Sequence, residues 1–232
     1  MCNRDFASKQ LNMINNRIVT AAALAKRDPR EIKLIGASKQ QSADHLHQFH
    51  QAGLTNFGEN YLQEALTKQT ELTKDPINWH FIGKPQSNKC KIIAQNFDWI
   101  HSVDRLKIAC RLAEHRSHES NSTLNLLIQL NVDLEESKNG VSLNDAPSLS
   151  SQIYDLDGIS LRGYMLIPSP SKSSEEQRRP FALAREVLEK TNQRYGFQLD
   201  TLSMGMSNDL EAAILEGATM LRVGTALFGS RP

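Results

Sequence analysis

The sequence is poor in several features that define specialised classes of protein. It has three cysteines in 232 residues, Cys2, Cys90 and Cys110, which lie far apart and form no CxxC motif. An odd number of scattered cysteines argues against a disulfide framework and favours reduced thiols, so we expect a cytoplasmic protein. Glycine (12) and proline (8) together make 20 residues, which excludes collagen-like and low-complexity chains.

Long apolar runs and an excess of charge of one sign are also lacking. No run approaches the ~20 residues that span a bilayer, and the polar residues 1–18 lack the apolar core of a signal peptide. The 27 lysines and arginines are balanced by 26 aspartates and glutamates. Because a duplex nucleic-acid binder usually carries a basic excess, we expect neither a membrane nor a nucleic acid as partner.

Short apolar runs alternate with longer amphipathic stretches along the chain. Leu11, Ile14, Ile18 and Ala22 recur at steps of three and four, which predicts an N-terminal helix. Eight apolar runs are predicted strands, at residues 33–38, 55–59, 79–83, 99–103, 124–131, 161–167, 201–205 and 220–225. The predicted helices lie at residues 42–52, 61–73, 87–95, 104–118, 142–154, 180–193 and 208–216.

The order of these elements predicts a fold. Several strands are continuously apolar, as parallel strands are when both faces are covered. Eight strands with a helix in nearly every gap predict a (β/α)8 TIM barrel, whose usual length of ~250 residues fits the chain. We therefore expect one domain over residues 1–232, an N-terminal helix followed by the barrel. The alternative is a doubly wound open sheet, but no GxGxxG motif follows the first strand.

One segment departs from this rhythm. Residues 168–178, PSPSKSSEEQR, contain two prolines and four serines and are predicted to be a polar loop. Such a loop is either a solvated connection or a mobile lid over the end of the barrel that carries active sites. Pro180 is expected in the first turn of the next helix, where its missing N–H costs nothing.

Lys39 closes the first predicted strand and is a candidate nucleophile. The functional end of a barrel is the carboxyl end of its strands. A lysine that is partly desolvated there can become neutral and form a Schiff base with an aldehyde. Taken alone, a lysine at a strand end is more often an exposed loop residue.

The loops after the last two strands favour a functional role for Lys39 over that of an exposed loop lysine. Ser207 is a predicted N-cap of the following helix, and Gly224 allows close approach of the backbone to a ligand. These two loops are where many barrels bind phosphate. A phosphate site opposite a lysine predicts a phosphorylated aldehyde as ligand, and pyridoxal 5′-phosphate is such a compound.

Longer motifs in the same regions resemble a known family. Six motifs follow one another from about residue 30 to 231: LIGASKQ, FGENYLQEA, WHFIGKPQSNK, LNVDLEESKNGV, LRGYMLIP and LSMGMSNDLEAAILEGATMLRVGTALFG. In sequence and order they are similar to the YggS/PROSC family of pyridoxal phosphate homeostasis proteins. The resemblance implies the barrel of the alanine racemase N-terminal domain. It also implies a carrier that holds pyridoxal 5′-phosphate, serves vitamin B6 homeostasis and can deliver the cofactor to apo-enzymes. We further expect a monomer.

The resemblance also implies which residues bind the cofactor. Lys39 matches the lysine that carries the cofactor as a Schiff base, and Arg222 matches the residue that faces the pyridine nitrogen. The remaining matched residues line the pocket or bind the phosphate: Asn60, Met206, Ser207, Gly224 and Thr225. No catalytic residue and no metal ligand is predicted.

The alternative function is that of a weak racemase or a related pyridoxal enzyme. A guanidinium such as Arg222 donates but does not accept protons, so it leaves the pyridine nitrogen unprotonated and the ring a weak electron sink. Racemases with this barrel also use a second domain, which we do not expect here because the sequence ends at Pro232, soon after the eighth strand. Tyr61 and Tyr164 are predicted to pack, and His80 to be a hydrogen-bonded interior histidine.

Overall fold

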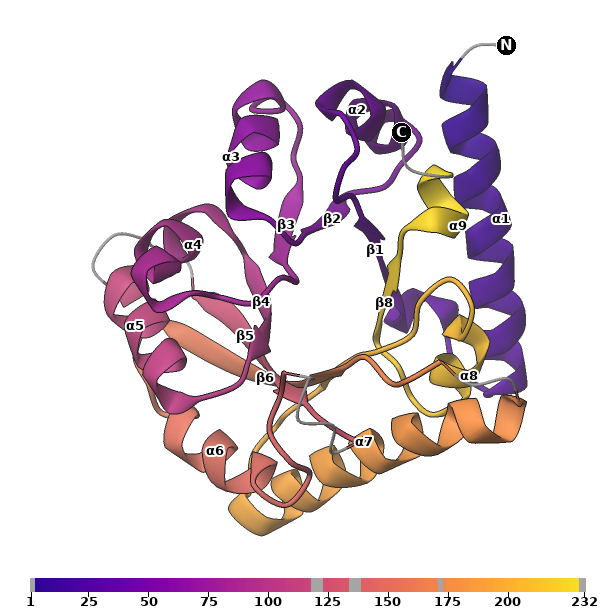
Figure 1. The fold of residues 1–232 in the computed structure, drawn as a ribbon. Helices are drawn as coiled ribbons and strands as arrows, with labels where there is room; N and C mark the ends of the chain where they lie inside the picture. The colour runs from indigo at the N-terminus through magenta and orange to yellow at the C-terminus, as the bar shows by residue number, and fades with distance from the viewer. Residues whose placement is uncertain (1–2, 118–122, 134–138, 171–172, 230–232) are drawn as a thin grey trace.

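Eight parallel strands close into a barrel at the centre of the molecule (Figure 1). The computed structural model describes residues 3–117, 123–133, 139–170 and 173–229. Each strand pairs with the next along the chain, and the last pairs with the first. The strands are β1 (Lys33–Ala37), β2 (Asn56–Glu59), β3 (Asn78–Phe81), β4 (Trp99–Val103), β5 (Leu124–Leu130), β6 (Ile159–Leu166), β7 (Thr201–Ser203) and β8 (Met220–Val223).

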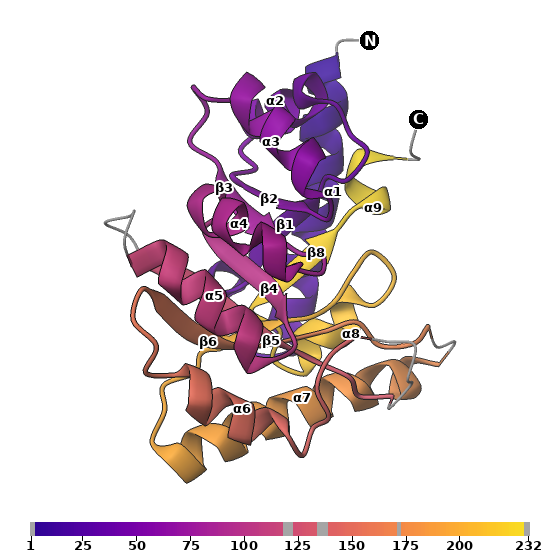
Figure 2. The ribbon, with the colours of Figure 1, turned by 60° about the vertical axis from the view of Figure 1, so that its left-hand side comes forward.

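Helices surround the barrel. They are α1 (Asn3–Leu24), α2 (Ala43–Gln51), α3 (Leu62–Glu71), α4 (Cys90–Asn96), α5 (Leu106–Ser117), α6 (Ala146–Ile153), α7 (Ser174–Tyr195), α8 (Leu210–Leu215) and α9 (Thr225–Phe228), with short 3₁₀ turns η1 (Pro29–Glu31) and η2 (Ser87–Lys89). Helix α1 packs on the outside against α2, α8 and α9 (Figure 1), and α6 and α7 lie side by side (Figure 2). None of the described helices is long and apolar enough to cross a membrane.

The predicted (β/α)8 barrel and its N-terminal helix are confirmed. Each predicted strand ends within two residues of an observed one. The pairing of β1 with β8, in which Lys33 lies opposite Met220 and Gly36 opposite Val223, rules out the open doubly wound sheet. The predicted apolar face of α1 is also the buried one, since Leu11 is only 6% exposed and Ile14 is fully buried.

The start of α7 differs from the prediction. The helix begins at Ser174, so the second half of the segment 168–178 is helical and not a loop. Pro180 consequently lies inside the helix and not in its first turn. Residues 171 and 172 of this segment lie outside the described part of the chain.

Local capping and one ion pair explain why α7 begins early. The Ser173 hydroxyl accepts a hydrogen bond from the N–H of Glu176 (3.1 Å), which satisfies one of the free donors of the first turn. The next turn is tied to the body of the protein by Arg178, whose Nε donates to the carboxylate of Glu216 (2.7 Å). These interactions offset the hydrogen bond that Pro180 cannot donate.

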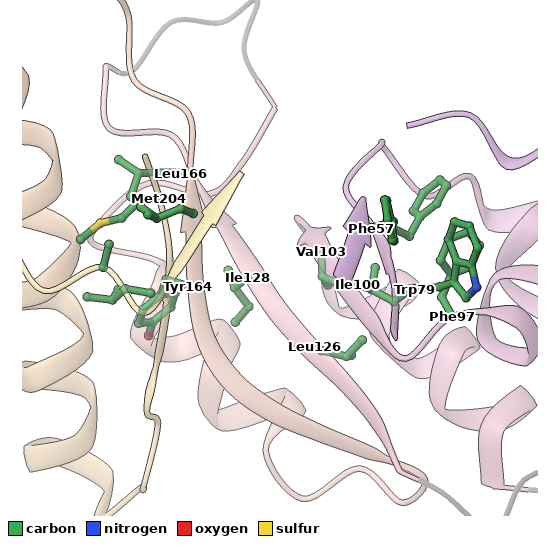
Figure 3. Packing of buried hydrophobic residues seen from close by; sticks show 14 of the residues in the cluster. Phe57, Trp79, Phe97, Ile100, Val103, Leu126, Ile128, Tyr164, Leu166 and Met204 are labelled. Atoms are coloured by element: carbon green, nitrogen blue, oxygen red, sulfur yellow. The ribbon is translucent and has the colours of Figure 1, made fainter. Parts of the chain in front are cut away.

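Apolar side chains form two layers. The larger lies between the strands and the helices, and Figure 3 shows two parts of it, with Tyr164, Leu166 and Met204 in one and Phe57, Trp79 and Phe97 in the other. A smaller cluster fills the barrel interior and consists of Ile35, Trp99, Leu127, Met165 and Met220. The interior cluster fills the middle of the barrel with side chains, as is usual for this fold.

Candidate functional site

A cavity of about 390 Å³ opens at the carboxyl ends of the strands. This is the end at which barrel active sites are built, and the volume is within the usual range of ~300–1,000 Å³ for small-ligand sites. All seven residues that the sequence analysis assigns to cofactor binding line this one cavity: Lys39, Asn60, Met206, Ser207, Arg222, Gly224 and Thr225.

Every second side chain of β1 points into the barrel, and this row of side chains ends at the cavity. Lys33 lines a second cavity at the opposite end of the barrel, and Ile35 belongs to the interior cluster. Ala37 and Lys39 then line the upper cavity. Because successive side chains of a strand point to opposite faces, Lys39 continues the inward row of β1 beyond the end of the strand.

Strand β8 repeats this pattern beside β1. Met220 belongs to the interior cluster, and Arg222 and Gly224 line the cavity. A Cβ on Gly224 would lie 3.3 Å from the carbonyl oxygen of Ala37, so the two strand ends approach closely. The pairing of first and last strands therefore makes the Lys39 loop and the Gly224 loop adjacent walls of one site.

Four backbone amides at the cavity have no acceptor within the described residues. They belong to Ser207, Asn208, Gly224 and Thr225, all of which line the cavity. Unpaired N–H groups in consecutive loop residues attract anions such as phosphate. The loops after β7 and β8 therefore present donors that suit an anion.

Ser207 is not the N-cap of α8, contrary to the prediction. A turn from Met206 to Asp209 comes first, and α8 follows it. The hydroxyl of Ser207 instead accepts a hydrogen bond from the N–H of Ala226 (3.3 Å), and its carbonyl oxygen accepts one from Nη2 of Arg17 in α1 (2.9 Å). Ser207 thus joins these two loops to each other and to the N-terminal helix.

Arg222 provides a buried cation at the cavity. Its Nη1 donates to the carbonyl oxygen and the hydroxyl of Ser203 (2.6 Å each), and its Nη2 donates to the carbonyl oxygen of Leu166 (2.8 Å). Desolvation lowers the pKa of Arg222 to about 10, with the charge of Asp209 acting in the opposite direction. The guanidinium therefore stays positively charged at neutral pH and offers donors only.

A chain of buried polar side chains runs from Arg222 through the barrel. The hydroxyl of Ser203 contacts Nδ1 of His101 (2.8 Å), and Nε2 of His101 contacts Nδ1 of His80 (2.9 Å). Nε2 of His80 in turn contacts Oδ1 of Asn56 (3.1 Å). The prediction that His80 is a hydrogen-bonded interior residue is confirmed, and the chain fixes the geometry of the Arg222 guanidinium from below.

Asn60 reaches the cavity because two strand ends meet closely. A Cβ on Gly83, just after β3, would lie only 2.0 Å from the carbonyl oxygen of Asn60. Only glycine allows this approach, which places the loop after β2 at the cavity wall.

Several known proteins are similar to this chain over most of its length. The sequence matches the family described as alanine racemase, N-terminal domain, over residues 12–232. The pyridoxal phosphate homeostasis protein of Pseudomonas aeruginosa is 52% identical over 215 residues, which are 93% of this chain and 91% of that protein. The protein of the same name from Escherichia coli K12 is 42% identical over 227 residues, 95% of each chain.

A solved structure is similar to this chain in both sequence and fold. PipY of Synechococcus elongatus PCC7942, determined with PLP bound, is 36% identical, with a TM-score of 0.82 over 96% of this chain and all of the other. The chain belongs to the family of pyridoxal phosphate homeostasis proteins. This confirms the resemblance of the sequence motifs.

Several cavity residues of this family member are absent from the sequence-based prediction. Asn208 follows a predicted residue directly, but its contribution is a backbone amide, which any residue provides. Gln177 comes from the part of α7 that the sequence predicts as a loop. Ile167 could have been found, because it lies two residues beyond the interior Met165 and so continues the inward row of β6.

The two tyrosines considered for a racemase-like role behave differently. Tyr164 packs as predicted, fully buried, with its hydroxyl 2.8 Å from those of Ser150 and Thr191. The prediction for Tyr61 is wrong, because its side chain is 57% exposed where the chain turns into α3. Neither tyrosine is among the described residues that line the cavity. Within the same described ranges, no cluster of His, Cys, Asp and Glu could hold a metal ion.

The buried histidines predict how stability depends on pH. Burial lowers the pKa of His80 to about 3, with Lys33 as the second cause, and burial lowers that of His101 well below 6.5, with His80, Arg222 and Lys33 adding to the effect. Because the unfolded chain binds these protons at higher pH, the free energy of unfolding falls as pH drops below about 6.5. At pH 5, His80 alone should cost about 2 kcal/mol relative to pH 8, and His101 should add to this loss.

Urea unfolding at pH 8, 6.5 and 5 measures this effect. His80→Gln, which keeps a neutral hydrogen-bonding side chain, should lose about half of the pH dependence that the two histidines cause. A stability that stays level from pH 8 to pH 5 in the wild type would contradict the assignment of two neutral interior histidines.

Proposed function

We propose that this protein binds pyridoxal 5′-phosphate in the cavity and takes part in intracellular vitamin B6 homeostasis. The observation that carries the proposal is a single cavity that combines a lysine, a buried cation and four unpaired amides. The named relatives and PipY with PLP bound support the same ligand.

The residues present suit each functional group of this ligand. The amides of Ser207 and Asn208 and those of Gly224 and Thr225 would hold the phosphate, which carries up to two negative charges. The Arg222 guanidinium would donate a hydrogen bond to the pyridine nitrogen.

Lys39 would hold the ligand covalently. When bound, the ligand would supply an aldehyde, and the Lys39 amine would condense with its carbon to give a carbon–nitrogen double bond, with release of one water. The reaction is reversible, since water or another amine can displace the lysine. The residue that captures the ligand can therefore also release it, which is what a carrier requires.

Arg222 favours holding the ligand over transforming it. A guanidinium that is already charged cannot take up a proton, and its buried hydrogen bonds to Ser203 and Leu166 fix it in place. Beside it the pyridine nitrogen stays unprotonated, which weakens the ring as an acceptor of electrons. A weaker acceptor disfavours the carbanion that racemisation would form, so Arg222 counts against the racemase alternative.

The broader setting follows from the same chemistry. We propose a cytoplasmic, monomeric protein with one domain over residues 1–232 that delivers pyridoxal 5′-phosphate to apo-enzymes. The three scattered cysteines support the cytoplasmic location. The reversible bond to Lys39 supports delivery.

Replacing Lys39 tests the covalent site. Wild-type protein mixed with pyridoxal 5′-phosphate should show a visible absorption band that differs from that of the free compound, and Lys39→Ala should lack it. Affinity should fall by about tenfold or more, equivalent to ~1.4 kcal/mol. Lys33→Ala is the matched control, because Lys33 lies on the same inward row of β1 at the other end of the barrel. A band that survives in Lys39→Ala would place the bond on another residue.

Hydrogen exchange at Cα separates a carrier from a catalyst. The loaded protein in deuterated water with L- or D-alanine should exchange the Cα hydrogen no faster than free pyridoxal 5′-phosphate does, because Arg222 leaves the ring a weak electron sink. Nuclear magnetic resonance measures the exchange. Rapid exchange or loss of optical activity would favour the racemase alternative.

A further inference from the structure

A buried ionic cluster lies between the barrel wall and α3, behind the loop that carries Lys39. Its members are Ser38, Glu59, Glu64 and Lys68, referred to below as the Lys68 cluster. The ammonium of Lys68 donates to Oε1 of Glu59 (2.7 Å) and to Oε1 of Glu64 (2.6 Å). The Ser38 hydroxyl also donates to Oε1 of Glu59 (2.6 Å). Glu59 is fully buried and Lys68 is 4% exposed.

This cluster holds the backbone on both sides of Lys39. On one side, Nζ of Lys68 donates to the carbonyl oxygen of Ser38 (2.7 Å). On the other, the N–H of Gln40 donates to Oε1 of Glu64 (2.5 Å). One lysine and one glutamate, themselves paired, therefore fix the residues that precede and follow Lys39.

The backbone at this point needs such support. Gln40 has a φ of 63°, in the left-handed region that residues other than glycine rarely adopt. Residues in that region persist where the surrounding structure determines their conformation, and they gather at functional sites. Here the Glu64 carboxylate receives the Gln40 N–H and stabilises the turn.

The composition of the cluster is unusual for a packing contact. A buried ion pair is often no more stable than apolar side chains of similar volume, since both charges lose their hydration. Oε2 of Glu59 is buried with no hydrogen-bond partner among the described residues, and burial raises the pKa of this carboxyl against the opposing effects of Lys68 and Ser38. Stability alone does not explain why charged groups occupy this place.

We propose that the Lys68 cluster is a positioning device that orients Lys39 toward the cavity and so sets how effectively the protein captures an aldehyde. Lys68, Glu59 and Glu64 are positioning residues and do not touch the ligand. The inference rests on the proposed function, because it concerns the covalent bond that Lys39 would form. It adds three residues on which the capture step depends.

Comparing the affinities for two ligands distinguishes an effect on the orientation of Lys39 from an effect on ligand binding in general. Pyridoxal 5′-phosphate has an aldehyde, whereas pyridoxine 5′-phosphate has a hydroxymethyl group that cannot condense with an amine. The second compound therefore reports on the phosphate and ring contacts alone. In Lys68→Met, the Kd for pyridoxal 5′-phosphate should rise by about tenfold or more. The Kd for pyridoxine 5′-phosphate should change by less than about twofold.

Further variants control for loss of structure. Arg116→Met also removes a buried cation that donates to backbone carbonyls, those of Ala94 and Phe97, but at α5, and should leave both affinities unchanged. Glu64→Ala replaces a partly exposed residue and gives a second test if Lys68→Met does not fold. Lys68→Arg, which keeps the charge and the donors, should recover part of the capture.

The outcomes are distinct. A selective loss of pyridoxal 5′-phosphate binding in Lys68→Met and Glu64→Ala supports the inference. An equal loss of affinity for both ligands, or no loss, would overturn the inference. The proposed function would still stand in that case if the wild type forms its absorption band. If the wild type binds neither ligand, the proposed function fails and the inference fails with it.

Discussion

The pairing of β8 with β1 is the contact on which the candidate site depends. The first strand of the barrel leads to Lys39, and the last carries Arg222 and leads to Gly224. If this sheet stayed open between β8 and β1, these residues would lie on opposite edges. Closure makes them neighbours, and the outer helices and the apolar layer beneath them hold the closed form. The fold thus creates the site by joining the two ends of its own sheet.

Both chemically active side chains are supported by buried polar groups. Arg222 is held by Ser203, His101 and the residues beyond them, and the loop of Lys39 is held by the Lys68 cluster. Burying polar groups is costly unless they are paired, and apolar residues could fill the same space. In the proposed function these groups share one role, which is to hold an amine and a cation in place at one cavity. Capture of a reactive aldehyde would depend on this geometry more than on acids and bases that turn over a substrate.

How much of the fold and the site could be predicted from the sequence depends on how far apart the interacting residues lie along the chain. The strands could be predicted because an apolar run is a local property, and the two loops that line the cavity because their place after the last strands is a rule of the fold. The start of α7 could not, since it depends on a cap at Ser173 and on an ion pair with the distant Glu216. The burial of Lys68 could not be predicted either, because it depends on the packing of α3 against β2, which brings Lys68 to Glu59. The sequence predicts a local cap at Ser207, but the partners of Ser207 are in α1 and α9.

The most direct test of this account is to locate the covalent bond. The wild-type protein would be loaded with pyridoxal 5′-phosphate, reduced with borohydride to make the bond permanent, digested, and analysed by mass spectrometry. The account predicts that one lysine, Lys39, carries the added mass. In a parallel reaction, pyridoxine 5′-phosphate added as a competitor should lower the yield of labelled Lys39. Label on another lysine such as Lys33 or Lys68, or label spread over many exposed lysines, would contradict the central claim that the cavity holds the ligand through Lys39.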